Sequence, residues 1–141
     1  MSESKSEKSL HVCYSQKACF TPDSATSTAT VARRICPDHV IYDENRDEYR
    51  PSTAAFTDDS YGGPMSVGLL CVESADDQLI GYRNYSMVEL VVGFLRSEDQ
   101  SVCPWPTKNN KSHAHVCGQK PKSRRKLFAK SAKWIVKNFG V

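Results

Sequence analysis

Charge is divided so unevenly along this chain of 141 residues that it limits how the two parts can fold together. Residues 100–141 contain ten Lys or Arg and no Asp or Glu, whereas residues 1–99 contain sixteen Asp or Glu and nine Lys or Arg. The formal net charge of only +3 conceals this separation. Because the basic part cannot neutralise itself, its cations must face solvent, pair with the acidic part, or bind an anionic partner.

Two polar segments near the N-terminus set the expected extent of the folded unit. Residues 1–9 are polar and of mixed charge, and residues 21–30 have small side chains with neither helical nor strand periodicity. We therefore expect residues 1–29 to form a poorly ordered tail. Residues 30–141 are expected to form a single compact domain, which is long enough to bury one core.

The apolar content indicates a protein that does not enter a membrane. No apolar run approaches the ~20 residues that a membrane-crossing helix needs, and the N-terminus lacks the pattern of a secretory signal. Without such a signal, the six cysteines are expected to be free thiols rather than disulfides. We therefore predict a cytoplasmic protein with no membrane partner.

The most regular pattern lies at the C-terminus and predicts an amphipathic helix over 124–139, capped by Ser123 and ended by Gly140. Its apolar face would consist of Phe128, Ala132, Ile135 and Phe139. Its opposite face would carry a row of lysines, namely Lys126, Lys130, Lys133 and Lys137. A helix of this kind packs its apolar face on a core and leaves the charged face outside.

Alternation and turn residues predict the remaining elements. Strands are expected over 31–35 and 113–117, and a helix over 66–75 with Ser66 as its N-cap. Residues 86–95 fit both a capped helix and a buried strand, and we favour the strand. The predicted fold is therefore α+β, with a small mixed sheet and the C-terminal amphipathic helix packed on it.

The lysine row is the first candidate site. One helical turn separates successive lysines by about 5 to 6 Å, close to the spacing of phosphates along a nucleic-acid strand. Four further cations extend the basic patch toward the helix N-terminus: Lys120, Lys122, Arg124 and Arg125. Free backbone N–H groups at that end also favour anions. The alternative is a solvated face whose lysines pair in part with the acidic segment.

Arginines provide a second candidate anion site. Arg34 lies in the first predicted strand, where a long cation needs a partner. Arg50, Pro51 and Ser52 combine a bidentate anion donor with a hydroxyl at a potential helix start, which suits a nucleotide or another phosphorylated ligand. The alternative is that these arginines form salt bridges with neighbouring acids, such as Asp38, Asp43, Glu44 and Asp47.

Histidines provide the third candidate. His113 and His115 share one face of the predicted strand and, near Lys120, could act as general acid or base on a phosphoester or bind an anion when protonated. Four side chains are weak candidates for a tetrahedral zinc site: Cys36, His39, His115 and Cys117. Their spacing matches no zinc module. The structural alternative is a strand with a buried cysteine and hydrogen-bonded histidines. The sequence identifies no cofactor.

The spaced sequence ARRI…P…YRPSTAAF…PMSV…HAHVCGQK…RRKLFAKSAKW resembles a pattern found in a group of small, uncharacterised bacterial proteins. The resemblance extends from Arg33 to Trp134. It implies a shared organisation of the domain and a bacterial origin, and it implies no particular activity.

A more distant similarity is to small ADP-ribosyltransferase-like domains of the RES type. Arg34 would match the arginine in the first strand of that family, and Ser66 its later strand-borne serine. Glu73 or Glu89 would take the place of the family's glutamate. The run Arg50-Pro51-Ser52 stands where the family has Gly-Gly-Arg-Trp-Asn. This similarity implies an enzyme that processes a nucleotide.

Three functions follow from these patterns. We favour binding of nucleic acid or a nucleotide by the basic C-terminal third. The second is a small enzyme acting on a nucleotide or phosphoester, which requires a single pocket formed by Arg34, Arg50, His113 and His115. The third is a protein-interaction module of a bacterial multi-protein system that docks an acidic partner or another copy of itself.

Overall fold

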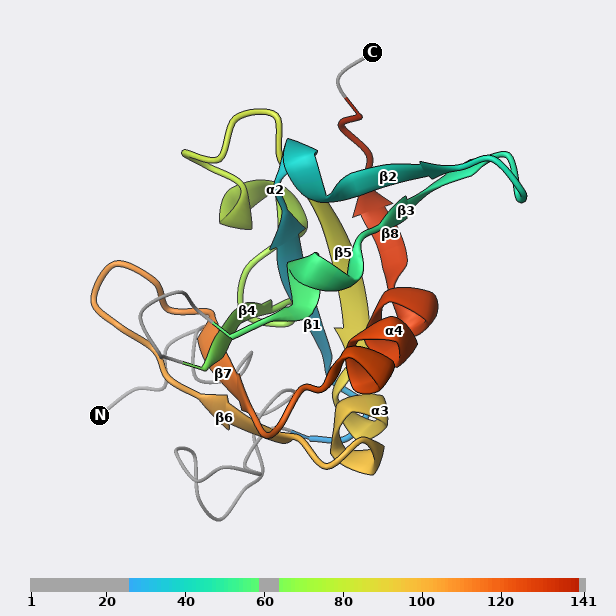
Figure 1. Cartoon of the computed structure of the whole chain (residues 1–141). Helices are drawn as coiled ribbons and strands as arrows, with labels where there is room; N and C mark the ends of the chain where they lie inside the picture. Colours follow the sequence, from blue (N-terminus) through green and yellow to red (C-terminus); the bar gives the residue numbers. More distant parts are fainter. Residues whose placement is uncertain (1–25, 59–63, 140–141) are drawn as a thin grey trace, which may run out of the picture.

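A six-stranded antiparallel sheet forms the centre of the computed structural model, which describes residues 26–58 and 64–139 (Figure 1). In order across the sheet the strands are β6 (Ser101–Pro104), β7 (His113–Cys117), β4 (Met65–Leu69), β1 (Thr30–Ile35), β5 (Ser86–Val91) and β8 (Lys133–Val136). Strands β2 (Val40–Asp43) and β3 (Glu48–Pro51) form a separate two-stranded hairpin. This hairpin projects from the body on the side where β8 lies (Figure 1).

Short helices connect and cover the strands. They are η1 (Pro37–His39), η2 (Thr53–Phe56), α2 (Ala75–Gln78), α3 (Val92–Ser97) and α4 (Lys122–Ser131). Helices α3 and α4 lie on the same side of the molecule, and α2 lies on the other side (Figure 1). The α+β class predicted from the sequence is confirmed.

The core lies between one face of the sheet and the helices. Val31 and Ile35 of the central strand β1 are fully buried. Phe56 of η2 and Phe128 of α4 meet edge to face, with their ring centroids 6.4 Å apart, and Phe94 of α3 contacts Phe128 at 6.1 Å. Phe128 therefore ties α4 to the core, as the apolar face of the predicted helix requires.

Three sequence predictions are confirmed in outline. Strand β1 contains the predicted 31–35, and β7 occupies the predicted 113–117. The ambiguous segment 86–95 begins as strand β5 and becomes helix α3 only at Val92. Ser86 does not cap a helix, because its hydroxyl accepts a hydrogen bond from the amide of Asn138 at 2.8 Å.

The predicted helix over 66–75 is wrong, because this segment begins with strand β4. Met65, Val67 and Leu69 alternate with Ser66 and place their side chains in the core. Strand β4 lies between β1 and β7, so its backbone groups are satisfied by two neighbours. A short helix, α2, starts only after Ser74, whose hydroxyl accepts from the amide of Asp77.

The predicted helix over 124–139 is too long. Helix α4 ends at Ser131, Ala132 takes an extended conformation, and residues 133–136 form strand β8. Trp134, Ile135 and Val136 have aromatic or β-branched side chains that favour strands. Pairing with the open edge of β5 satisfies their backbone groups, which a helical periodicity in the sequence does not reveal.

The two ends of the predicted helix also differ from the prediction. Pro121 occupies the N-cap position and Ser123 lies inside α4, because proline fits the start of a helix without losing a hydrogen bond. Gly140, the predicted stop, lies outside the described residues. Lys126 and Lys130 are on α4, whereas residues 133 and 137 lie on and after β8.

Residues 26–29, which fall in the predicted tail, contact the domain. Ala29 is 7% exposed and its carbonyl accepts from the amide of Val92 at 2.9 Å. The carbonyl of Ser27 accepts from the amide of Gly93 at 2.8 Å. These bonds fix the chain where it enters β1. The rest of the predicted tail lies outside the described residues.

Cysteine chemistry differs from the prediction at one position. Cys36 and Cys117 have free thiols, whereas Cys71 is disulfide-bonded. The expectation of free thiols is wrong for Cys71, because disulfide pairing depends on spatial contacts that sequence spacing does not reveal. The cytoplasmic location that rested on it stays a prediction. Within residues 26–58 and 64–139, no helix has the length and apolar character needed to cross a membrane.

Candidate anion-binding site

The β2–β3 hairpin forms one wall of the candidate site. Its turn is held by the carboxylate of Asp43, which accepts from the amides of Asn45 at 3.1 Å and Arg46 at 3.3 Å. Asp47 completes the turn in the left-handed region, with φ of 51°. The Asp43 carboxylate also lies 3.5 Å from Nε of Arg50 on the opposite strand. The negative charge of Asp43 is thus engaged within the hairpin.

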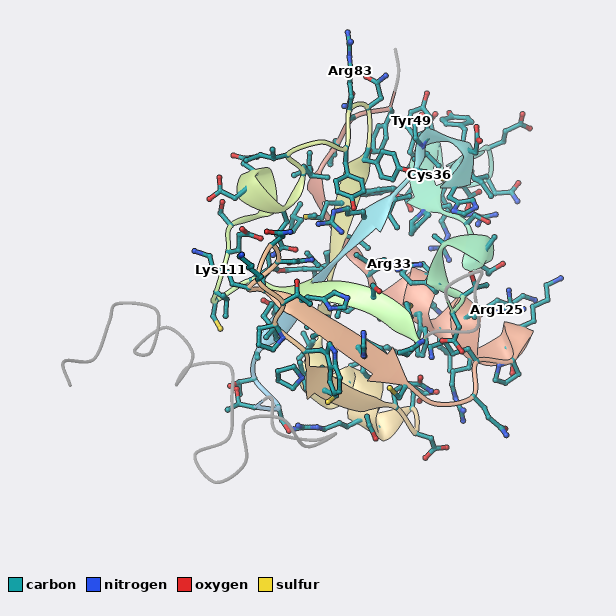
Figure 2. The ribbon with its side chains drawn as sticks, turned by 90° about the vertical axis from the view of Figure 1, so that its left-hand side faces the viewer. Arg33, Cys36, Tyr49, Arg83, Lys111 and Arg125 are labelled. Carbon is teal, nitrogen blue, oxygen red and sulfur yellow. The ribbon has the colours of Figure 1, made fainter. Side chains whose placement is uncertain are left out.

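Aromatic side chains anchor the hairpin to the body. The indole Nε1 of Trp134 on β8 donates to the backbone carbonyl of Tyr49 at 3.1 Å. Phe139 stacks on the Tyr49 ring at 4.6 Å and meets Trp134 edge to face at 4.9 Å. In Figure 2, Tyr49 lies beside the hairpin ribbon at the edge of the body. Because an isolated two-stranded hairpin is marginally stable, these contacts fix its position relative to β8.

Lysines of α4 and β8 form the facing wall. Lys122, Lys126 and Lys130 are four residues apart on α4, so they lie in one row at intervals of about 6 Å along the helix. Lys133 begins β8 and Lys137 follows its end. All five lysines are exposed.

The two walls enclose a groove of about 750 Å³. Two carboxylates line it, Asp43 and Glu48, against seven cations: Arg46, Arg50, Lys122, Lys126, Lys130, Lys133 and Lys137. In the part of the chain that the structure describes, none of the five lysines has an ion-pair or hydrogen-bond partner. The groove therefore has an excess of uncompensated positive charge.

Most of the anion-binding residues predicted from the sequence line this groove. They are Arg50, Ser52, Lys126, Lys130, Lys133 and Lys137. Ser52 caps η2 through its hydroxyl, which accepts from the amide of Ala54 at 3.1 Å. Arg46 was not predicted, because its position depends on the hairpin turn. Four acidic residues follow Ile41 within the same short segment. They predict salt bridges with nearby arginines, so the sequence does not indicate Arg46 as an anion-binding residue.

Lys120 lies outside the groove. Its side chain is only 4% exposed, and its ammonium contacts the Asp58 carboxylate at 2.6 Å. It also donates to the carbonyls of Val116 at 2.9 Å and Gly118 at 3.0 Å. Its cation links the end of β7 to the segment after η2 and has no donor left for a ligand.

Arginines in β1 are also engaged elsewhere. Arg34 donates from Nε to the carbonyl of Gln78 at 2.8 Å, and its guanidinium lies 4.0 Å from the ring centroid of Tyr82. Arg33 donates to the carbonyls of Ala55 at 3.0 Å and Ser66 at 2.7 Å. Arg33 is partly buried, and Figure 2 shows it near the middle of the view. Both arginines therefore hold neighbouring segments against β1.

His113 and His115 lie on β7, away from the groove. The two rings meet edge to face at 4.7 Å. Arg50 lines the groove and lies 3.5 Å from Asp43, whereas Arg34 donates to Gln78 and lies over the ring of Tyr82. The structure thus does not bring Arg34, Arg50, His113 and His115 into one pocket.

The candidate zinc ligands are similarly divided. Cys36 precedes η1 and His39 is its last residue, whereas His115 and Cys117 are on β7. Among the described residues, no group of three or more His, Cys, Asp or Glu side chains is placed to hold a metal ion. Spacing along the sequence did not reveal that the two pairs lie on different elements.

No protein-family model, curated protein or solved structure matches this chain. The chemistry of the groove is therefore inferred from its own residues. Ammonium groups at regular intervals around a concave surface can neutralise several phosphates at once. The guanidinium of Arg50 and the hydroxyl of Ser52 add directed hydrogen bonds at one end.

Proposed function

We propose that the groove between the β2–β3 hairpin, α4 and β8 binds a single strand of nucleic acid through its phosphates. The observation that carries this proposal is the concentration, in one concave site, of exposed lysines that have no polar partner among the described residues. A surface that is only solvated does not require the hairpin, α4 and β8 to place their cations around the same groove. Like charges at this spacing repel and weaken the helix, which favours a role for an anion between them.

Several features favour a strand over a mononucleotide. The α4 row runs from Lys122 to Lys130, which is eight residues or about 12 Å along the helix axis. Lys133 and Lys137 continue the positive surface along β8. A ligand with phosphates at regular intervals can contact the whole row, whereas one nucleotide would use only part of it.

The size and lining of the groove favour a single strand over a duplex. A volume of about 750 Å³ is typical of sites that enclose a small ligand, and it suits a short stretch of strand. Tyr49 lines the groove, is 37% exposed and has its ring stacked on Phe139, so it adds an ordered aromatic side chain to the basic site. Aromatic side chains next to a basic groove are typical of proteins that bind single strands without sequence preference.

Binding to labelled single- and double-stranded DNA and RNA, measured at low and at physiological salt, tests the proposal. We expect single strands to bind more tightly than duplexes, with affinity that falls steeply as salt rises. Each lysine that neutralises a phosphate of a single strand contributes about 0.7 to the slope of log K against log salt. Replacing Lys126 and Lys130 by Glu should therefore lower that slope by about 1.4.

A matched control separates the groove from net charge. Replacing Lys108 and Lys111 by Glu changes the total charge by the same amount in the loop between β6 and β7. Figure 2 shows Lys111 on the opposite side of the molecule from Arg125 of α4. The proposal requires that the groove variant loses binding and the loop variant keeps it. Equal losses in both variants, or none in either, would reject it.

Two other ligands are distinguished in the same assay. If ATP competes as well as an oligonucleotide at equal phosphate concentration, the ligand is a nucleotide. If an acidic peptide binds and neither nucleic acid nor nucleotide does, the groove docks an acidic protein partner.

A further inference from the structure

Ser66 and His113 form a hydrogen-bonded pair on the sheet face turned away from the core. Along β4 and β7, buried residues alternate with partly exposed ones, and Ser66, His113 and His115 belong to the partly exposed set. Ser66 lies opposite His115, and Gly68 lies opposite His113. The His113 ring reaches diagonally toward Ser66, and its Nε2 lies 3.3 Å from the serine Oγ.

A backbone carbonyl fixes the protonation pattern of His113. The ring Nδ1 lies 3.1 Å from the carbonyl oxygen of Trp105. A carbonyl oxygen only accepts hydrogen bonds, so in the neutral imidazole Nδ1 carries the proton and Nε2 has the lone pair that faces the Ser66 hydroxyl. The amide of Trp105 in turn donates to the carbonyl of His113 at 2.8 Å, which holds the orienting group in place.

Neighbouring rings restrict the orientation of the imidazole. His115 meets the His113 ring edge to face at 4.7 Å. The indole of Trp105 stacks on His115 at 5.5 Å, with 21° between the planes, and is 49% exposed. The pair is thus held in one geometry beside an exposed apolar surface that a substrate can contact.

We propose that Ser66 is a nucleophile activated by His113, and that this site hydrolyses carboxylic esters. Three linked groups carry the proposal: a serine hydroxyl, an imidazole base, and a third group that orients the base. The carbonyl of Trp105 takes the third role. The site lies on β4 and β7, whereas the basic groove involves β8, α4 and the hairpin, so this activity is independent of nucleic-acid binding.

The reaction balances without any cofactor. Ser66 Oγ attacks the ester carbonyl carbon and its proton passes to His113 Nε2. The bond between that carbon and the alkoxy oxygen then breaks, and the alcohol leaves with the proton from Nε2. Water attacks the acyl-serine, giving its proton to Nε2, and the carboxylic acid leaves as that proton returns to Ser66 Oγ.

A fluorophosphonate probe on the full-length protein tests the nucleophile. Ser66 Oγ would form a bond to phosphorus as the phosphorus–fluorine bond breaks, fluoride would leave, and His113 would take the hydroxyl proton. Mass spectrometry of peptides should find the adduct on Ser66. Its rate of formation should fall about 100-fold in His113→Gln, because a general base contributes at least that much. Hydrolysis of p-nitrophenyl acetate should fall in parallel.

Two variants provide controls. Ser101→Ala removes a serine from β6 on the same face, opposite Cys117, and should leave labelling unchanged. Ser66→Cys keeps the nucleophile position in case Ser66→Ala does not fold, and iodoacetamide should alkylate Cys at 66 faster than it does after His113→Gln is added. Circular dichroism establishes that each variant is folded.

The outcomes decide the proposal. Adducts on Ser66 that depend on His113 support it. An unlabelled Ser66 in folded protein, in a mixture where a serine protease is labelled, overturns it. Labelling of Ser66 that is unaffected by His113→Gln but lost in His115→Gln overturns the assignment of the base.

Discussion

The basic C-terminal segment contains cations of two kinds, which are separated by only a few residues. Lys120, just before α4, is 4% exposed and contacts a carboxylate and two carbonyls. Lys126 on α4 is exposed and, within the described residues, has no partner. The first kind holds the fold together, and the second gives the groove its charge. A run of positive residues in a sequence therefore need not have one purpose.

Local position decides which kind a cation becomes. Residues 118–121 connect β7 to α4, and they and the first turn of α4 pass the ends of other elements, where free carbonyls need donors. Arg124 donates to the carbonyl of Gln119 at 2.9 Å and contacts the Asp99 carboxylate at 2.9 Å. Farther along α4, Lys126 and Lys130 are exposed and have no polar partner within the described residues. Their charge is therefore available to the groove, because the described part of the fold does not use it.

The largest effect on stability is expected from Lys120→Met. The change leaves the carbonyls of Val116 and Gly118 without their charged donor, and hydrogen bonds to charged groups contribute about 2 kcal/mol. Loss of the ion pair adds little, since Asp58 is 48% exposed. We expect the free energy of unfolding, measured with urea, to fall by about 2 kcal/mol.

The adjacent position offers the matched control for that change. Lys122→Met removes an exposed lysine that lines the groove, so stability should stay within about 0.5 kcal/mol while affinity for single strands falls. Folded Lys120→Met protein should bind single strands as the unmodified protein does. The reverse pattern, with binding lost at 120 and stability lost at 122, would remove the distinction between the two kinds of cation.

An intermediate effect is expected at the hairpin anchor. Trp134→Phe deletes the indole N–H that donates to the carbonyl of Tyr49 and should cost about 1 kcal/mol of stability. Because that bond holds the hairpin beside β8, affinity for single strands should fall as well. Tyr49→Phe is the control, because it keeps both the carbonyl and the stacked ring. If Trp134→Phe changes neither stability nor binding, the hairpin does not form a fixed wall of the groove.

The secondary structure of a segment could be predicted where its local hydrophobic pattern agreed with the strands and helices that pack against it. The alternation of 113–117 matched a strand with one buried face, and the structure has that strand. Residues 133–136 fitted a helical periodicity, yet the open edge of β5 turned them into β8. Met65 and Leu69 are four apart, which fits a helix as well as a strand. In both errors a neighbour distant in sequence decided the outcome, and no local pattern contains that information.

The candidate site was predictable in composition and not in shape. Lys126 and Lys130 were identified because clustered cations indicate an anion, and Arg50 because a bidentate donor stands beside a hydroxyl at a possible helix start. Their meeting in one groove depends on the contact between Trp134 and Tyr49, which lie 85 residues apart in the sequence. Lys120 looked equivalent to the other lysines in the sequence, because burial is set by the folded arrangement of β7 and Asp58.

The smallest expected effect is a slight increase in the free energy of unfolding when Lys126 is replaced by Gln. This residue has Lys122 and Lys130 one turn away on either side, and each like-charge pair costs the helix about 0.2 to 0.5 kcal/mol. Lys126→Gln keeps helix propensity nearly unchanged and removes both repulsions. At low salt it should therefore raise the free energy of unfolding by a few tenths of a kcal/mol, while it weakens binding of single strands.

Salt provides the control for this last change. The gain in stability should disappear at about 1 M salt, where the screening length is about 3 Å and shorter than the spacing of the lysines. Lys120→Met should still be destabilising there, because the Lys120 side chain is only 4% exposed and its bonds to backbone carbonyls are screened little. A loss of stability in Lys126→Gln would mean that this lysine supports the fold, as Lys120 does. A gain with weaker binding would mean that the chain keeps a small destabilisation in α4 because the groove needs its charge.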